Sequence, residues 1–310
     1  MIRIFKSLGG YIEIPAAQNG CWLNVTNPTA DEIQTLIHDF SMPEDVIQDI
    51  LDTDERPRLE YDDFWSLIIL RIPVPSQSNG VPFYTVPLGV FMTESFTITL
   101  CSVVNEVLPP EEPSLYREQY QQVTDVLNFT LKLFLRAANV YLKYLKQINQ
   151  QTSLIETDLE KSIRNEELNR LLKMEKCLVY FVTSLKGNEL VLTKLKNQKK
   201  NSLTEINEDL FEDAVIENKQ AIEMSQIYSD IQSGMMDAFA SVISNNLNVV
   251  MKQLTSISII LMIPTLIASI YGMNVVNFLE NWPMAFPAIL VGSFLMAYLG
   301  ILLFKRKKWF

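Results

Sequence analysis

The sequence of 310 residues is poor in the side chains from which most zinc and copper sites and disulfide frameworks are built. It has one histidine, His38, and three cysteines, Cys21, Cys101 and Cys177, which are scattered and form no close pair. We therefore expect reduced thiols and no His/Cys metal site within one chain. A dedicated ion site would have to use carboxylates, amides, hydroxyls, backbone carbonyls or water, which is the ligand set of a hard cation such as Mg²⁺.

Positive charge is scarce in most of the chain. Residues 1–252 hold all but one of the 36 acidic residues and all but four of the 26 basic ones, which gives a net charge of about −13. Such a surface argues against a nucleic-acid partner. It could concentrate cations, although an acidic surface also serves solubility alone. No nucleophile, base or nucleotide motif stands out, so we expect neither an enzyme nor an organic cofactor.

Glycine and proline are frequent up to Pro113 and then nearly absent as far as Pro264. The first part, residues 1–112, alternates strand-like runs with short helical segments. This alternation predicts an α/β domain layered as an α/β/α sandwich. The expected strands lie within residues 3–14, 21–26, 64–72, 81–91 and 95–101.

Two helix starts are predicted in this first part. Thr29 and Glu32 form a capping-box pattern, and Ser41 and Glu44 repeat it with Pro43 inside the first turn. Residues 113–253 have helical spacing of apolar residues and predict a stalk of long helices, with three helices over about 116–160, 162–200 and 208–271. The last of these helices runs on from the stalk into the next segment.

Residues 254–274 are the most apolar stretch, with no charged side chain from Leu254 to Ile270. A helix over residues 255–271 is roughly 25 Å long, close to the lower limit for crossing a bilayer. A loop over 275–284 and a second uncharged span over 285–304 follow, and then a basic tail over 305–310. The absence of a leader-like N-terminus and the position of the tail predict a cell-membrane protein with both termini in the cytoplasm and the loop outside.

The first span carries a row of small or polar groups on one face. The members are spaced three or four residues apart, and in order from the far end they are Thr265, Met262, Ser258, Thr255, Met251, Asn248, Ser244, Ser241 and Asp237. Lipid cannot satisfy hydroxyl groups, so this row should face protein or water. Periodicity leaves two readings open: close packing between helices, with hydroxyls bonded to the carbonyl one turn earlier, or the lining of a pore.

The first span ends in Tyr271, Gly272, Met273 and Asn274, where Gly272 can stop the helix. An apolar span that ends in YGMN, a second span and a basic-aromatic tail resemble the CorA family of magnesium channels. Residues 248–255 and the segment 56–64, which contains Asp62 and Asp63, also resemble family stretches. One difference is the position of the proline, which in the family usually follows the methionine that matches Met262 directly; here Ile263 stands between that methionine and Pro264.

The resemblance implies a homopentameric channel whose first span lines the pore. It assigns hydrated Mg²⁺ to an outer ring of Asn274 amides, and it implies that the path inward is lined by Thr265, Met262, Ser258, Thr255, Leu254, Met251, Asn248 and Asp237. It also implies a regulatory divalent-ion site between subunits, with Asp213 from one chain and Asp63 or Asp62 from its neighbour. Without the resemblance, the Asp62–Asp63 pair is more typical of a solvated entry to a strand than of a metal site.

Three functions remain open on the sequence. The first is Mg²⁺ uptake driven by the membrane potential and gated by intracellular Mg²⁺. The second is that the protein is a relative that transports Co²⁺, Ni²⁺ or Zn²⁺. Met273 argues against zinc, because family members tuned to zinc commonly lack methionine at the matching position. The third is a membrane-anchored scaffold without transport, which gives no reason for the row from Asp237 to Thr265.

Overall fold

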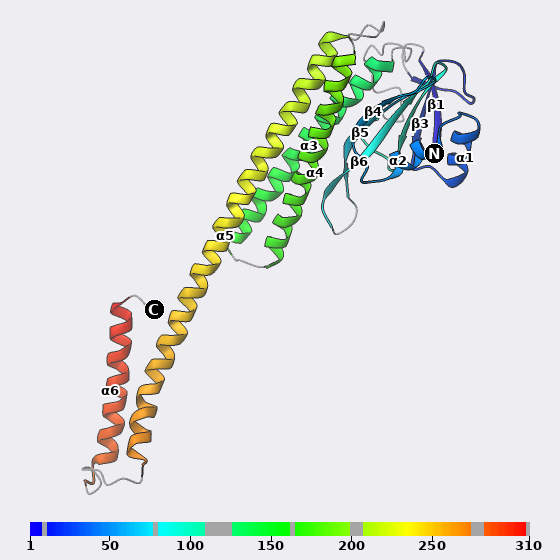
Figure 1. Ribbon diagram of the computed structural model, residues 1–310. Helices are drawn as coiled ribbons and strands as arrows, with labels where there is room; N and C mark the ends of the chain where they lie inside the picture. Colours follow the sequence, from blue (N-terminus) through cyan, green and yellow to red (C-terminus); the bar gives the residue numbers. More distant parts are fainter. Residues whose placement is uncertain are drawn as a thin grey trace. The chain divides into compact units, whose positions relative to one another are not determined.

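The computed structural model describes residues 1–7, 11–76, 80–108, 126–161, 165–198, 207–273 and 282–307 (Figure 1). The chain divides into two compact units, Met1–Gly234 and Met235–Phe310, and the boundary falls within one long helix. The domain boundaries predicted at 112/113 and 253/254 stay predictions, and the first of them lies outside the described residues.

The first unit is built on a seven-stranded sheet in the order β2-β1-β3-β7-β6-β5-β4. Only β3 and β7 pair in parallel, and every other neighbouring pair is antiparallel. The strands are β1 (Ile2–Ser7), β2 (Tyr11–Glu13), β3 (Cys21–Thr26), β4 (Arg58–Tyr61), β5 (Ser66–Pro75), β6 (Phe83–Met92) and β7 (Phe96–Cys101). All but β4 match the sequence prediction within a few residues, and β4 was not predicted.

Two short helices, α1 (Ala30–His38) and α2 (Glu44–Leu51), cover one face of the sheet. Their buried side chains, such as Leu36 and Ile47, pack with Leu23, Ile69 and other inward residues of the central strands. These side chains are nearly inaccessible to water, so this layer is a closed apolar core.

The first helix start is confirmed and the second is wrong. Thr29 caps α1, and its hydroxyl and the Glu32 carboxylate form the reciprocal capping box. In α2 the N-cap is Pro43 itself, with no side-chain hydrogen bond to the helix start. Ser41 lies two residues before this N-cap, with φ of 50°, and so does not occupy the position from which a side chain caps the first turn.

The long helices α3 (Val126–Lys161) and α4 (Asn165–Gln198) cover the other face of the sheet, which completes the predicted α/β/α sandwich (Figure 1). Aromatic side chains fill this second interface: Tyr141 and Phe181 meet edge to face, and Phe83 stacks on Tyr144. The predicted helices agree with α3, α4 and α5 (Glu208–Tyr271), except that the expected start of the first, near residue 116, lies outside the described residues.

The second unit consists of the later part of α5 and of α6 (Ala285–Arg306). Both helices contain a stretch long and apolar enough to cross a membrane, and only 6% of each such stretch is buried within the chain. A core helix of a soluble protein would be mostly buried, so these helices need lipid or other protein chains around them.

Candidate functional site

The candidate site is one face of α5 in the second unit, which we call the α5 row. Its members are the eight residues predicted to line a path: Thr265, Met262, Ser258, Thr255, Leu254, Met251, Asn248 and Asp237. All eight side chains are exposed in the single chain. Met262 is 66% exposed and Leu254 is 55% exposed, although both are apolar.

The second span packs against a different face of α5. Within α5, Ser256 is fully buried, and Ile260 and Ile263 lie closest to Gly300 of α6. On α6, the residues buried in the middle of the helix are the small Ser293 and Ala297, one turn apart, which let two helices approach closely. The packing role expected for small residues is thus filled by Ser256, Ser293 and Ala297, while the α5 row remains uncovered.

Two hydroxyl groups of the α5 row bond back to the helix. Ser258 donates to the Leu254 carbonyl at 2.9 Å, and Thr265 donates to the Leu261 carbonyl at 3.0 Å. Such bonds to the carbonyl one turn earlier are part of the packing interpretation of this row. They use only the hydroxyl hydrogen. The oxygen lone pairs stay available, so each hydroxyl presents an acceptor to whatever lies on that face.

The first span ends where the sequence predicts. Tyr271 is the last helical residue, and the Gly272 N–H still bonds to the Ala268 carbonyl at 2.9 Å. A Cβ at Gly272 would lie 3.3 Å from that carbonyl oxygen, which is a tight contact. Met273 is 58% exposed, and Asn274 lies outside the described residues. Pro264 does not end the helix, since α5 runs through it.

The predicted regulatory carboxylates are exposed and belong to different parts of the first unit. Asp62 and Asp63 lie in the turn between β4 and β5, where the Asp63 N–H bonds to the Asp62 carboxylate at 2.6 Å. Asp213 is exposed on α5. Among the described residues of one chain, no three His, Cys, Asp or Glu side chains are placed to hold a metal ion. A single chain therefore does not join these carboxylates into a site.

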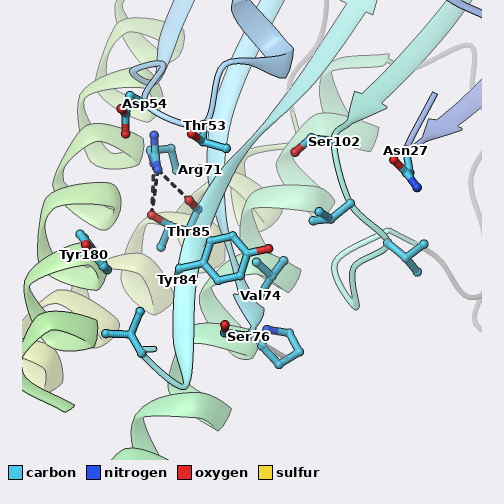
Figure 2. A pocket seen from close by; sticks show the side chains of 14 residues that line it. Asn27, Thr53, Asp54, Arg71, Val74, Ser76, Tyr84, Thr85, Ser102 and Tyr180 are labelled. Atoms are coloured by element: carbon cyan, nitrogen blue, oxygen red, sulfur yellow. Dashed lines mark hydrogen bonds between the residues drawn. The ribbon is translucent and has the colours of Figure 1, made fainter. Parts of the chain in front are cut away.

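The sequence reasoning missed Arg71, the one charged residue of β5. Its guanidinium lies in a cavity between the sheet and α4 (Figure 2). Arg71 could have been identified as the lone charge inside the apolar run 67–74. An unpaired charge in a buried strand costs free energy and therefore needs an explanation.

Comparison with known proteins agrees with this arrangement. Residues 17–306 match the family described as "CorA-like Mg2+ transporter protein". The chain is 26% identical over 296 residues to the "Cobalt/magnesium transport protein CorA" of Methanocaldococcus jannaschii, a match that covers 93% of this chain and 90% of that protein. It is 25% identical to the protein of the same name from Thermotoga maritima, with 93% and 83% covered.

A solved structure has the same fold along the whole chain. The complete structure of the CorA magnesium transporter from Methanocaldococcus jannaschii superposes with a TM-score of 0.79 at 23% sequence identity, over 100% of this chain and 99% of that one. The family match spans both units described above, from the β3 region to the end of α6. This chain belongs to the CorA family.

Proposed function

We propose that the protein is a membrane channel for Mg²⁺ uptake, driven by the membrane potential. The observation that carries the proposal is the uncovered α5 row, a line of hydroxyl, amide, carboxylate and thioether groups on a membrane-length helix. A membrane potential of 100 mV favours inward movement of a divalent cation by about 4.6 kcal/mol. The names of the relatives, which are cobalt/magnesium transport proteins, support this class of cargo.

The proposed assembly is a homopentamer in the lipid membrane. Two spans cannot enclose a water-filled path, so the α5 rows of several copies have to surround a common axis. The row is uncovered because α6 packs on the other side of α5, which leaves it free to face neighbouring copies. In native mass spectrometry from mild detergent we expect five copies, and a stable monomer would contradict the pore and favour a membrane-anchored scaffold.

We propose that Asn274 selects the ion, with Tyr271, Gly272 and Met273 fixing its position. Magnesium loses its bound water reluctantly, so a ring of amide oxygens can hold the hydrated ion without stripping it. Further inward, Thr265, Ser258 and Thr255 suit the same hydrated ion. The hydroxyl hydrogens of Thr265 and Ser258 are already used within the helix, so those oxygens can only accept bonds from its water molecules.

The apolar members of the α5 row suit a gate. Met262, Leu254 and Met251 can form constrictions that close by excluding water, and Asp237 can draw cations toward the inner end together with Asn248. We place both termini in the cytoplasm and the YGMN loop outside, because Lys252 precedes the first span and Lys305 follows the second.

We propose regulation by intracellular Mg²⁺ at the contact between neighbouring chains. Asp213 of one chain would face Asp63 or Asp62 of the next, and bound ions would offset the repulsion between carboxylates and favour a closed state. Phe64, which directly follows this pair, is 82% exposed, as expected for a side chain that a neighbouring chain covers. In the single chain, exposure of all three carboxylates leaves them accessible for such a contact.

The decisive experiment is ion flux into liposomes. We expect Asn274→Ala to abolish Mg²⁺ uptake while the protein still assembles, because the substitution removes every copy of the selecting oxygen at once. Asn246→Ala is the matched control: this residue is also exposed on α5 but lies outside the α5 row, and it should keep normal uptake. Normal Mg²⁺ flux through correctly assembled Asn274→Ala protein would falsify the selectivity assignment.

A second candidate is transport of another divalent ion. Both named relatives carry cobalt as well as magnesium in their names, so Co²⁺ is the first ion to compare, followed by Ni²⁺ and Zn²⁺. The same liposomes distinguish the two functions. If Co²⁺ enters faster than Mg²⁺ at equal concentration, and excess Mg²⁺ does not compete, cobalt is the physiological cargo.

A further inference from the structure

The first unit contains an open cavity of about 900 Å³ that the proposed ion path does not use (Figure 2). Asn27 and Ser102 line it, and each follows the end of a strand: β3 ends at Thr26 and β7 at Cys101. Among the described strands these two form the only parallel pair, and their last residues are paired. In mostly parallel α/β sheets, ligands bind outside the carboxyl ends of the strands, and this one parallel pair offers the same local arrangement.

A positively charged group lies inside the cavity. The Arg71 guanidinium donates to the Glu55 carbonyl at 2.7 Å, to the Thr85 carbonyl at 2.7 Å, and to the Thr85 hydroxyl at 3.0 and 3.3 Å. All these acceptors are neutral, and no carboxylate in the described part of the chain forms an ion pair with Arg71. Four of the five N–H groups are used, which leaves one Nη1–H for another acceptor.

Burial makes this arrangement costly. It lowers the pKa of Arg71, because the charged guanidinium loses contact with water. The nearby Asp52, Asp54 and Glu55 carboxylates offset this effect only partly and from a distance. A partly buried cation without a direct anionic partner is stabilised when an anion binds beside it.

A second polar group in the cavity wall lacks a partner. The Ser102 hydroxyl oxygen is buried, and no hydrogen bond from the described residues reaches it. Buried hydroxyl groups in native proteins are almost always hydrogen-bonded, so an unpaired one needs an explanation. A bound molecule that reaches the end of β7 would supply the missing bond.

The remaining wall indicates the shape and charge of the ligand. Tyr84, Tyr180 and the valines at positions 74, 81 and 104 offer flat and apolar surface, which suits a planar organic body. Asp54, exposed at the same cavity, would repel a polyanion such as a nucleoside triphosphate. The geometry points to a binding site for a small organic anion that has one phosphate or carboxylate group at Arg71, a planar body against Tyr84, and a polar group within reach of Ser102.

Calorimetric titration of the full-length protein in detergent tests this site. AMP and phenylacetate serve as probes with a phosphate and a carboxylate head on a planar body, while adenosine and inorganic phosphate each lack one of the two parts. We expect AMP or phenylacetate to bind at least tenfold more tightly than both adenosine and inorganic phosphate. Binding of AMP alone identifies a phosphate head, and binding of phenylacetate alone identifies a carboxylate head. No binding of either up to about 10 mM, where even a weak site would be largely filled, overturns the proposal.

Two variants separate ligand binding from a purely structural role of Arg71. Ser102→Ala should weaken the bound probe about threefold to tenfold, the value of one neutral hydrogen bond, without lowering the melting temperature of the free protein. Arg71→Lys keeps the charge but loses the planar fork, and should weaken binding at least tenfold. Ser95→Ala and Arg170→Lys, both at exposed positions outside the cavity, should change nothing. Unchanged affinity in folded Ser102→Ala and Arg71→Lys would overturn the site.

Discussion

The side-chain amide of Asn188 on α4 forms two hydrogen bonds with the backbone of Arg71 on β5. Its Oδ1 accepts from the Arg71 N–H at 2.8 Å, and its Nδ2 donates to the Arg71 carbonyl at 2.8 Å. Strand β4 pairs with β5 only as far as Arg58 opposite Ile69, so Arg71 lies beyond its end. The Asn188 amide therefore replaces the missing strand and satisfies backbone groups that water cannot reach.

Removal of this amide should destabilise the first unit strongly. We expect Asn188→Ala to lower the free energy of unfolding by about 2–4 kcal/mol, because Asn188 is only 1% exposed and the Arg71 N–H loses its partner. In thermal unfolding this loss corresponds to roughly 5–10 °C. Asn169→Ala, at an exposed position of the same helix, is the control and should shift the transition by no more than about 2 °C. Equal shifts of the unfolding transition in the two variants would show that the Asn188 amide stabilises the protein no more than an exposed asparagine does.

Gly187 allows α4 to approach the segment that enters β4. A Cβ at this position would lie 2.7 Å from Cγ and 3.0 Å from Cδ of Pro57, whose ring cannot rotate away. We expect Gly187→Ala to destabilise the protein by about 1–3 kcal/mol, despite the better helix propensity of alanine. Gly234→Ala is the matched control, because a Cβ there meets nothing within 4 Å, and it should be neutral or slightly stabilising. A stabilising Gly187→Ala would mean that the helix and the segment can separate without cost.

Alkaline pH should weaken the first unit. Burial raises the pKa of Cys101 to about 11 and that of Cys177 to about 11. A thiol whose pKa is higher in the folded state keeps more protons there, so its stabilising effect is complete below pH 9 and is lost as pH rises toward 11. Each thiol accounts for about 2–3 kcal/mol over this range. Melting temperatures at pH 8 and pH 10.5 measure the loss.

A single substitution assigns part of this pH dependence. Cys101→Ala should be less stable at pH 8, because the side chain is fully buried, but its melting temperature should fall less between pH 8 and pH 10.5 than that of the unmodified chain. If the melting temperatures of the two proteins fall equally between pH 8 and pH 10.5, the Cys101 thiol does not contribute to alkaline unfolding.

The proposed regulatory site can be tested without measuring transport. We expect Asp213→Ala and Asp63→Ala each to raise the Mg²⁺ concentration that protects the first unit from proteolysis by about tenfold, because one carboxylate is lost from each bridge. Asp230→Ala, which removes another exposed carboxylate of α5, is the control and should keep the normal midpoint. An unchanged midpoint in both test variants would place the regulatory site elsewhere, with Asp62 the next candidate.

The sequence by itself was sufficient where a local pattern has one structural solution. The uncharged run from Leu254 to Ile270 lies in a membrane-length helix, Thr29 and Glu32 form the capping box of α1, and α5 ends at Tyr271, the first residue of the YGMN segment. The spacing of the α5 row also identified a face that the second span leaves uncovered. Each of these features depends on residues within a few helical turns, so no distant contact is needed to interpret it.

Only the tertiary structure decided the features that depend on residues far apart in the chain. The pattern around Ser41 resembled a helix cap, but the chain turns at Ser41 and Pro43 takes the N-cap position. No local pattern pairs Asn188 with Arg71, because 117 residues separate them. The cavity beside Arg71 exists because β3 and β7, distant in sequence, end side by side. Strand order and helix packing bring such groups together, and those are set by burial of the whole core rather than by any local pattern.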